Sequence, residues 1–424
     1  MRGLSFGLMV LLCAAGPLWA QSTGPAENAE SVRALLERIE RLEKRLAELE
    51  ARHPAGSNGS SAGVASSAAE PTAPHAAAEK REPAGVSHAG MAQGTMPPQE
   101  AATYPALKIS GFADVNFSAT DETGTTSGFN LGQFVLHMAS PLSKKVSYFG
   151  EVSFTATATG YNVEVERSII RYDHNDYFKL SFGRYHSPVN YWNTAFHHGS
   201  WLQTTISRPE MIRFGGRFLP VHFIGFLAEG DIPSGGAGLS YNVGVGNGRG
   251  SVISRGGDAG DVNNNRAWLV NIFSRPSRVY GLQIGGGVYH DKLSPGPGQR
   301  FREWISSAHL VWTRETPEFL AEFANVHHND VNTGHVFNSQ AFYVQLGYRL
   351  PWSEKRWKPY YRFEYTHVPR SEPVIGVTSL LGSTLGLRYD ISDFAAFKGE
   401  YRNTQRGAGQ PHINGLFLQT SFTF

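Results

Sequence analysis

Basic residues recur at alternating positions in the last fifth of the sequence, where apolar and polar residues alternate. Because successive side chains of a β-strand point to opposite faces, these residues are predicted to share one face of a sheet. A row of fixed positive charges guides anions along a surface, whereas cross-strand ion pairs only stiffen the sheet. Both interpretations stay open. The basic residues are Arg349, Arg362, Arg388, Lys398 and Arg402, interleaved with Glu364, Asp390 and Glu400.

A second basic and aromatic group lies within residues 185–217, where Glu210 is the only acidic residue. At about 30 residues this connection is long enough to suggest a function of its own. We expect it to favour small anions, although Trp192 and Trp201 suit packing against a wall better than contact with a solute. The site residues predicted here are His186, Trp192, His197, His198, Arg208 and Arg213.

Histidine and serine could support other chemistry. Three of the sixteen histidines precede residue 104, and the rest include the pairs His197-His198 and His327-His328. Neighbours on a strand point to opposite faces, so such a pair chelates only in a loop. No spacing resembles a known metal site, and we predict neither a metal nor another cofactor. Ser200 beside His198 is the only pair suggesting a hydrolase, so no catalytic residue is predicted and we do not expect an enzyme.

The elements that must position these residues are short strands. From residue 104 onward, stretches of about ten residues alternate apolar and polar positions, the length at which a tilted strand crosses a membrane. Seven tight connections alternate with eight longer ones, among which we count residues 156–162, 185–217 and 370–382. We therefore predict an all-β fold, a transmembrane antiparallel barrel over residues 104–424. It has sixteen strands, or 14 or 18 if one connection is misread.

Composition removes several other classes of protein. Lys and Arg number 38 against 36 Asp and Glu, which gives no case for binding nucleic acid. The single cysteine excludes a disulfide scaffold and a multi-cysteine zinc site. No run of 18 apolar residues follows the first twenty, so membrane-spanning helices are not expected.

The N-terminal 103 residues divide into three predicted parts. Residues 1–20 have a basic start, an apolar stretch and a small residue before the expected cleavage site, which is typical of a secretory signal peptide. Residues 21–52 contain a heptad seam and are predicted to form a coiled coil. Residues 53–103 are rich in Ala, Pro, Gly and Ser, and are predicted to be a disordered linker.

The heptad segment favours three helices over other states. Two stretches, 38–43 and 45–50, resemble the trimerisation motif of short coiled coils, in which Arg lies over the seam and pairs with Glu on the next helix. A dimer is also compatible with the seam, and a single amphipathic helix with i,i+4 charge pairs is the simplest alternative. The residues concerned are Arg38, Ile39, Leu42, Glu43, Arg45, Leu46, Leu49 and Glu50.

The end of the chain carries the most specific pattern. Phe424 terminates a strand-like alternation that places Leu416, Leu418, Thr420 and Phe422 on the same face. This ending resembles the signal that the barrel-assembly machinery reads in bacterial outer-membrane proteins. Together with residues 180–188 (LSFGRYHSP), 191–199 (YWNTAFHHG), 219–223 (LPVHF) and 244–249 (GVGNGR), it makes the chain resemble trimeric porins related to the phosphate-selective porins, especially those with an N-terminal coiled coil.

The resemblance implies an outer-membrane location in a Gram-negative cell, with a periplasmic helix and a homotrimer surrounded by lipid. It implies passive diffusion of small anions or polar solutes, with residues 185–217 folded into the pore as a constriction. Phosphate itself is not carried over, because no ligand ladder matches residue by residue. A non-selective diffusion porin, and a structural tether between outer membrane and cell wall, remain the alternatives.

Overall fold

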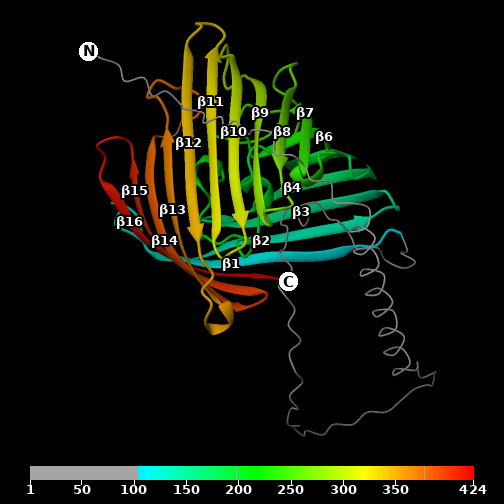
Figure 1. Ribbon diagram of the computed structural model, residues 1–424. Helices are drawn as coiled ribbons and strands as arrows, with labels where there is room; N and C mark the ends of the chain where they lie inside the picture. The colour runs from blue at the N-terminus through cyan, green and yellow to red at the C-terminus, as the bar shows by residue number, and fades with distance from the viewer. Residues whose placement is uncertain (1–103, 197, 377) are drawn as a thin grey trace, which may run out of the picture. The chain divides into compact units, whose positions relative to one another are not determined.

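The computed structural model describes residues 104–196, 198–376 and 378–424. The predicted signal peptide, coiled coil and linker, with Arg38 to Glu50, lie outside the described residues. Sixteen strands pair with their sequence neighbours and close into one antiparallel barrel, which confirms the predicted fold class and strand number (Figure 1). Among the described residues, no helix is both long and apolar enough to cross a membrane.

The elements follow one another in simple order around the barrel. They are β1 (Lys108–Thr120), β2 (Gly128–Pro141), β3 (Val146–Thr157), β4 (Gly160–Asn175), β5 (Phe178–His186), α3 (Trp192–Ala195), η1 (Glu210–Ile212), β6 (His222–Ile232), η2 (Gly235–Ala237), β7 (Leu239–Asn247), β8 (Ala267–Ser274), β9 (Leu282–Leu293), β10 (Phe301–Thr313), β11 (Glu318–Asp330), β12 (Val336–Gly347), η3 (Ser353–Lys355), β13 (Trp357–His367), β14 (Leu380–Ser392), β15 (Ala395–Arg406) and β16 (His412–Thr423).

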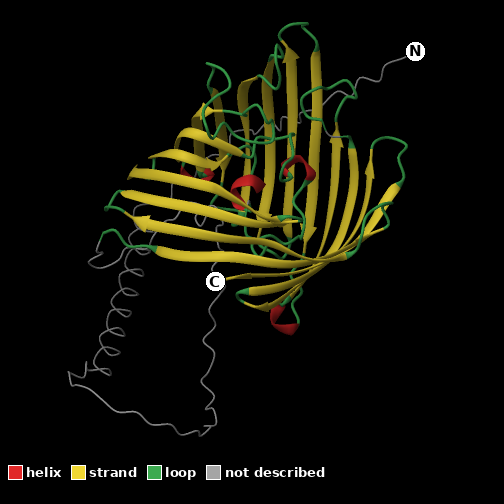
Figure 2. Ribbon diagram, turned by 180° about the vertical axis from the view of Figure 1, so that it is seen from behind, coloured by secondary structure: helices red, strands yellow, loops and turns green. Residues whose placement is uncertain are grey.

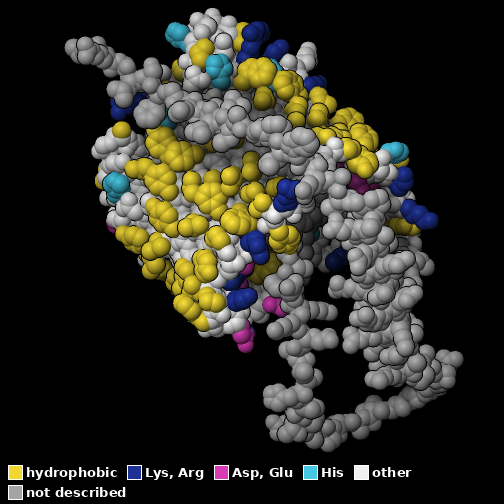
Figure 3. Space-filling model, viewed as in Figure 1, with side chains coloured by type: hydrophobic (Ala, Val, Ile, Leu, Met, Phe, Trp, Pro, Cys, Tyr) yellow, Lys and Arg dark blue, Asp and Glu magenta, His cyan; other side chains and the backbone are white. Residues whose placement is uncertain are grey.

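The alternation of residue types decides which side chain faces which side. On β12, Phe342 and Leu346 are exposed on the outer face, whereas Tyr343 and Gln345 are each only 1% exposed on the inner face. An apolar outer face covers much of the barrel surface (Figure 3). Such a barrel is stable in a membrane because its apolar outer face lies in hydrocarbon and its backbone groups are all hydrogen-bonded within the closed sheet.

Aromatic side chains gather at one end of the barrel, beside its tight turns. Tyr177, Tyr280, Trp352 and Phe394 are all more than half exposed there. Tyr and Trp rings are suited to the interface between hydrocarbon and water, so this end has the girdle of a membrane barrel. The connections at this end have two to nine residues between strands, and the three longest connections, residues 187–221, 248–266 and 368–379, lie at the other end. Two connections predicted to be longer, residues 331–335 and 407–411, have only five. The connection at residues 156–162 is an exception, since β3 ends at Thr157 and β4 begins at Gly160, forming a tight hairpin.

Closure of the barrel depends on the last residues. β1 pairs antiparallel with β16, and the backbone N–H of Gly111 donates to the carbonyl of Phe424 at 2.8 Å, while Phe424 N–H donates back at 3.1 Å. The ring of Phe424 stacks on Phe134 with centroids 5.7 Å apart and is 54% exposed. The terminal residue is therefore part of the seam; its role as an assembly signal stays a prediction.

Candidate functional site

The longest connection between strands folds into the barrel. We call residues 187–221, between β5 and β6, the inner loop; it contains α3 and η1. Short helical turns are visible within the ring of strands (Figure 2). Trp192, Ile212 and Phe218 of this loop are at most 2% exposed, because their side chains pack among residues of the opposite wall such as Tyr343. The connection that the resemblance expects inside the pore thus lies within the barrel; that it forms the constriction stays a prediction.

One edge of the inner loop is fastened to β11 by a carboxylate. Glu322 accepts hydrogen bonds from the backbone N–H groups of Tyr191 and Trp192, each at 2.9 Å. The hydroxyl of Tyr343 also donates to Glu322. These contacts satisfy backbone donors at the start of a short helical turn. Sequence reasoning did not find Glu322, because alternation along a strand shows which face a residue lies on but not what it binds.

The predicted basic row faces inward, but three of its members bind the inner loop. Lys398 Nζ donates to the carbonyls of Ser200, Gln203 and Thr205. Arg388 Nη1 donates to the carbonyls of Trp201 at 2.8 Å and Gln203 at 3.0 Å.

Arg362, 1% exposed, donates to the carbonyl of Ser207 at 2.7 Å and to the Thr205 hydroxyl at 3.1 Å. A charged donor that is committed to backbone carbonyls positions the loop rather than presenting an open charge to a solute.

All four arginines of the row make ion pairs. Arg362 pairs with Glu364 at 2.8 Å and Arg388 with Asp390 at 2.7 Å, each along its own strand. Arg349 lies just beyond β12, in the tight connection, and pairs with Glu315 at 2.9 Å and with Asp390. Arg402 pairs with Glu400 at 2.5 Å and lies 3.7 Å from the centre of the Phe417 ring. The cross-strand pairing considered from sequence therefore describes Arg349, which pairs with Asp390 of β14. Arg402 pairs along its own strand, β15, and loop anchoring was not foreseen for the other three.

The predicted loop residues occupy different surroundings. Trp192 is fully buried, and Arg208 lies 3.8 Å over the Phe214 ring and donates to the carbonyl of Ile212. Arg213 pairs with Glu210 at 3.3 Å and is half exposed. His197 lies outside the described residues.

His186, at the end of β5, and His198 are both 5% exposed and lie near one another, with ring centres 5.8 Å apart. Ser200 donates to Asp114 Oδ1 at 2.8 Å, so its hydroxyl is engaged with a carboxylate on β1.

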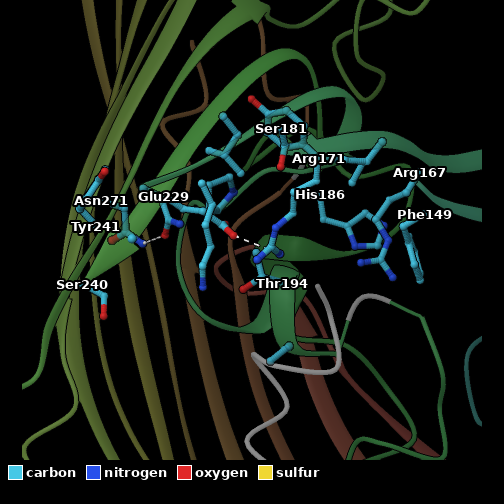
Figure 4. A pocket seen from close by; sticks show the side chains of 18 of the residues that line it. Phe149, Arg167, Arg171, Ser181, His186, Thr194, Glu229, Ser240, Tyr241 and Asn271 are labelled. Atoms are coloured by element: carbon cyan, nitrogen blue, oxygen red, sulfur yellow. Dashed lines mark hydrogen bonds and ion pairs between the residues drawn. The ribbon is translucent and has the colours of Figure 1, made fainter. Parts of the chain in front are cut away.

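A cavity of about 330 Å³ opens on the side of the inner loop nearer the tight turns. Figure 4 shows Asn271 and Ser240 on one side of it, Arg167 and Phe149 on the other, and Thr194 of the inner loop between them. Four basic and two acidic side chains line it, so positive charge is in excess. They are Arg167, Arg171, Lys179 and Arg275 against Glu229 and Asp231.

A second cavity, of about 620 Å³, lies on the side of the longer connections against β1, β2 and β13–β16. Four basic and three acidic side chains line it: Arg208, Arg213, Arg402 and Arg406 against Asp114, Glu210 and Glu364. The inner loop contributes to both cavities, and both linings have more basic than acidic groups. Only Arg208, Arg213 and Arg402 among these basic residues were predicted site residues. The sequence did not single out Arg167, Arg171, Lys179, Arg275 and Arg406.

Comparison with known proteins gives the fold. No protein-family model matches the chain, and no curated protein matches it significantly. Among solved structures, the anion-selective porin from Comamonas acidovorans is similar with a TM-score of 0.57 and 11% identity, covering 76% of this chain and all of that one. The outer-membrane channel DcaP of Acinetobacter baumannii (TM-score 0.53, 13% identity, 76% and 97% covered) and Salmonella typhi OmpF in complex with daunomycin (0.53, 11%, 75% and 97%) are also similar. Residues 104–424 therefore have the closed-barrel fold of these bacterial porins.

Proposed function

We propose that the chain is an outer-membrane porin that lets small hydrophilic solutes diffuse passively, with a preference for anions. The excess of basic side chains in both cavities beside the inner loop carries this proposal. Fixed charge in a narrow, low-dielectric passage raises the local concentration of the oppositely charged solute. A structural neighbour is itself named as an anion-selective porin, which supports the same direction.

The charge preference is measured as a reversal potential in a planar lipid bilayer with a potassium chloride gradient. We expect a sign that reports chloride preference. Lys179→Glu, which reverses a charge at the first cavity, should shift the potential toward the cation side. Lys355→Glu, in the exposed tight turn between β12 and β13, is the matched control and should leave it unchanged.

Each other outcome of that measurement selects an alternative. Clear cation preference of the unaltered protein contradicts the proposed selectivity. A potential near zero favours the non-selective diffusion porin. Absence of conductance from a correctly folded barrel leaves the structural tether as the better account of the chain.

The proposal includes a homotrimer in the outer membrane, related to the phosphate-selective porin group, with the N-terminal helix in the periplasm. The heptad seam and the paired Arg–Glu positions at 38–50 support three helices, and the apolar outer face supports contact with lipid. Closure in three equal steps in single-channel records would report the trimer. Deleting residues 21–103 should preserve conductance if the barrel alone is the channel.

The C-terminal strand ending at Phe424 is proposed to be the segment that the barrel-assembly machinery recognises. Its support is the terminal aromatic on an amphipathic strand at the barrel seam. Phe424→Ala should lower the amount of folded protein in the outer membrane without changing the conductance of the molecules that do fold.

A further inference from the structure

Five buried residues bring histidine and carboxylate side chains together where the inner loop meets the wall. We call Glu151 of β3, Glu166 of β4, His186 of β5, His198 of the inner loop and His222 of β6 the histidine cluster. All five are at most 9% exposed. Potential ligand atoms of Glu151, His186 and His198 lie within 4.8 Å of one another, and those of Glu166, His186 and His222 do the same.

Two distances in the cluster fit a tetrahedral metal. Ligand atoms held roughly 2.0–2.1 Å from a tetrahedral Zn²⁺ are about 3.4 Å from one another. His186 Nε2 and Glu151 Oε2 are 3.4 Å apart, and His198 Nε2 and Glu166 Oε1 are 3.1 Å apart. The ligand atoms of Glu151, His186 and His198 lie within 4.8 Å of one another, so side-chain adjustments of about 1 Å bring these three atoms around one ion.

Hydrogen bonding favours His198 as a metal ligand. Its Nδ1 lies 3.1 Å from the amide oxygen of Gln133, which only accepts hydrogen bonds. Nδ1 therefore donates a hydrogen bond to Gln133, and a metal would replace only the proton that Nε2 shares with Glu166. Such a hydrogen bond from the other ring nitrogen is the usual support for a metal-binding histidine.

His222 has the opposite arrangement. Arg184 Nη2 donates to His222 Nδ1 at 3.1 Å, so the neutral ring carries its proton on Nε2, which lies 2.8 Å from Glu166 Oε2. His222 is thereby suited to orient Glu166 by a hydrogen bond rather than to bind a metal itself. Of the two residue sets, the one with His198 is therefore favoured.

The charges around the cluster admit a cation. Three guanidinium groups act on its carboxylates: Arg167 contacts Glu151 at 2.5 Å, Arg184 lies 3.6 Å from Glu166, and Arg208 acts on Glu166 electrostatically. Arg184 is shared with two further carboxylates, those of Glu164 at 2.9 Å and Asp258 at 2.8 Å. Four carboxylates thus face three guanidinium groups, and with neutral histidines the surroundings retain negative charge.

We propose that Glu151, His186 and His198 bind one Zn²⁺ ion, with Glu166 or a water molecule in the fourth position. Two imidazoles and a carboxylate are ligands that Zn²⁺ accepts. Because Glu151 and His186 belong to the wall and His198 to the inner loop, the ion ties the loop to β3 and β5. Sequence reasoning missed the site, since its residues come from three strands and a loop and share no spacing along the chain.

Metal binding by the untagged, full-length protein tests the site directly. The protein is folded in detergent, stripped with EDTA, and titrated with Zn²⁺, or with Co²⁺ as a spectroscopic probe. We expect one metal per chain and visible Co²⁺ absorption of tetrahedral intensity. His198→Ala and His186→Ala should each weaken binding at least about tenfold, and Gln133→Leu, which keeps every ligand but removes the partner of Nδ1, by about tenfold.

His309→Ala is the matched control. His309 is a buried, inward-facing histidine on β10 that hydrogen-bonds Gln283 and takes no part in the cluster, so this variant should bind the metal as the unaltered protein does. Absence of stoichiometric binding, or equal binding by the unaltered protein and both ligand variants, overturns the proposal. These readouts do not depend on conductance, so the site and the porin function can fail separately.

Discussion

The inner loop meets the wall of β11 and β13–β15 and the wall of β2–β6 through different chemistry. On the first wall, Lys398, Arg388 and Arg362 donate to loop carbonyls. Carboxylates there accept loop N–H groups, Glu322 from Trp192 at 2.9 Å among them. On the second wall, the loop's His198 faces Gln133 and Glu166 through its two ring nitrogens.

This difference separates a permanent anchor from an adjustable one. Arg side chains keep their charge throughout the physiological pH range, and backbone carbonyls do not titrate. Imidazole is a common metal ligand. The first wall therefore fixes where the loop runs, whereas the contact at the second wall depends on metal if the proposed zinc site binds its ion.

Lys398→Met should have the largest effect, because it removes the donor to three loop carbonyls in a fully buried place. The lost charged hydrogen bonds cost about 3–5 kcal/mol of loop docking. Protease cleavage within the inner loop should then rise by roughly 100- to 4,000-fold, since cleavage follows the population of the open form.

Lys144→Met, in the exposed turn between β2 and β3, is its matched control and should leave cleavage unchanged. Cleavage of Lys398→Met at the rate of the unaltered protein would show that the first wall does not anchor the loop.

How much of this could be read from the sequence differs between the two walls. Parity along β13 and β15 placed Arg362 and Lys398 on the inner face, because strand periodicity is regular. Their partners were not predictable, since the inner loop has no periodicity and its carbonyls are set by tertiary packing. Glu322 faces inward like many other residues, and nothing in its neighbours indicates that two N–H groups will reach it.

The second wall was less predictable still. Glu151 and His186 meet because β3 and β5 both flank β4, and the two residues stand at similar heights in the register. His198 joins them only through the course of the inner loop. A metal search along the chain examines spacing within one segment, so a site divided among separate elements gives no signal.

Glu322→Gln should have an intermediate effect on the first wall. The amide keeps one acceptor oxygen but loses the charge that accepts N–H groups from Tyr191 and Trp192. The expected loss is about 1–2 kcal/mol, which is roughly a tenfold rise in loop cleavage. Glu354→Gln, in an exposed tight turn, is the control. If Glu322→Gln changed the cleavage of the inner loop as little as Glu354→Gln does, the basic residues alone would hold the loop.

His222→Gln should have a smaller effect on the second wall when metal is chelated. Glutamine can still accept from Arg184 and donate to Glu166, so about 0.5–1 kcal/mol is expected. Cleavage of the inner loop should rise less than about fivefold. His327→Gln, which changes a histidine bonded to Asn338 away from the loop, provides the reference. If His222→Gln weakened loop docking as much as Lys398→Met, the second wall would hold the loop as firmly as the first, contrary to the comparison.

The smallest effect is expected when the pH is lowered at a different histidine–carboxylate contact. This is the contact of His328 with Glu372, in the connection between β13 and β14. Burial would raise the pKa of Glu372, but hydrogen bonds from His328, Ile375 N–H and Val374 N–H outweigh it and hold the pKa below its ordinary value of 4.5. A carboxyl with a depressed pKa stabilises the fold above its ordinary pKa, and this contribution is lost as the pH falls through the lower, folded value.

Cleavage of the connection between β13 and β14 should therefore be faster in Glu372→Gln than in the unaltered protein at neutral pH. The difference corresponds to about 0.5 kcal/mol in the free energy of opening. The two should converge as the pH falls below 4.5. The inner loop should show no such convergence in this variant, because Glu372 is not among its contacts. If acid exposes the β13–β14 connection and the inner loop to cleavage at the same pH, both in the unaltered protein and in Glu372→Gln, the two segments open as one unit. The division into a permanent and an adjustable wall would then describe contacts that do not act independently.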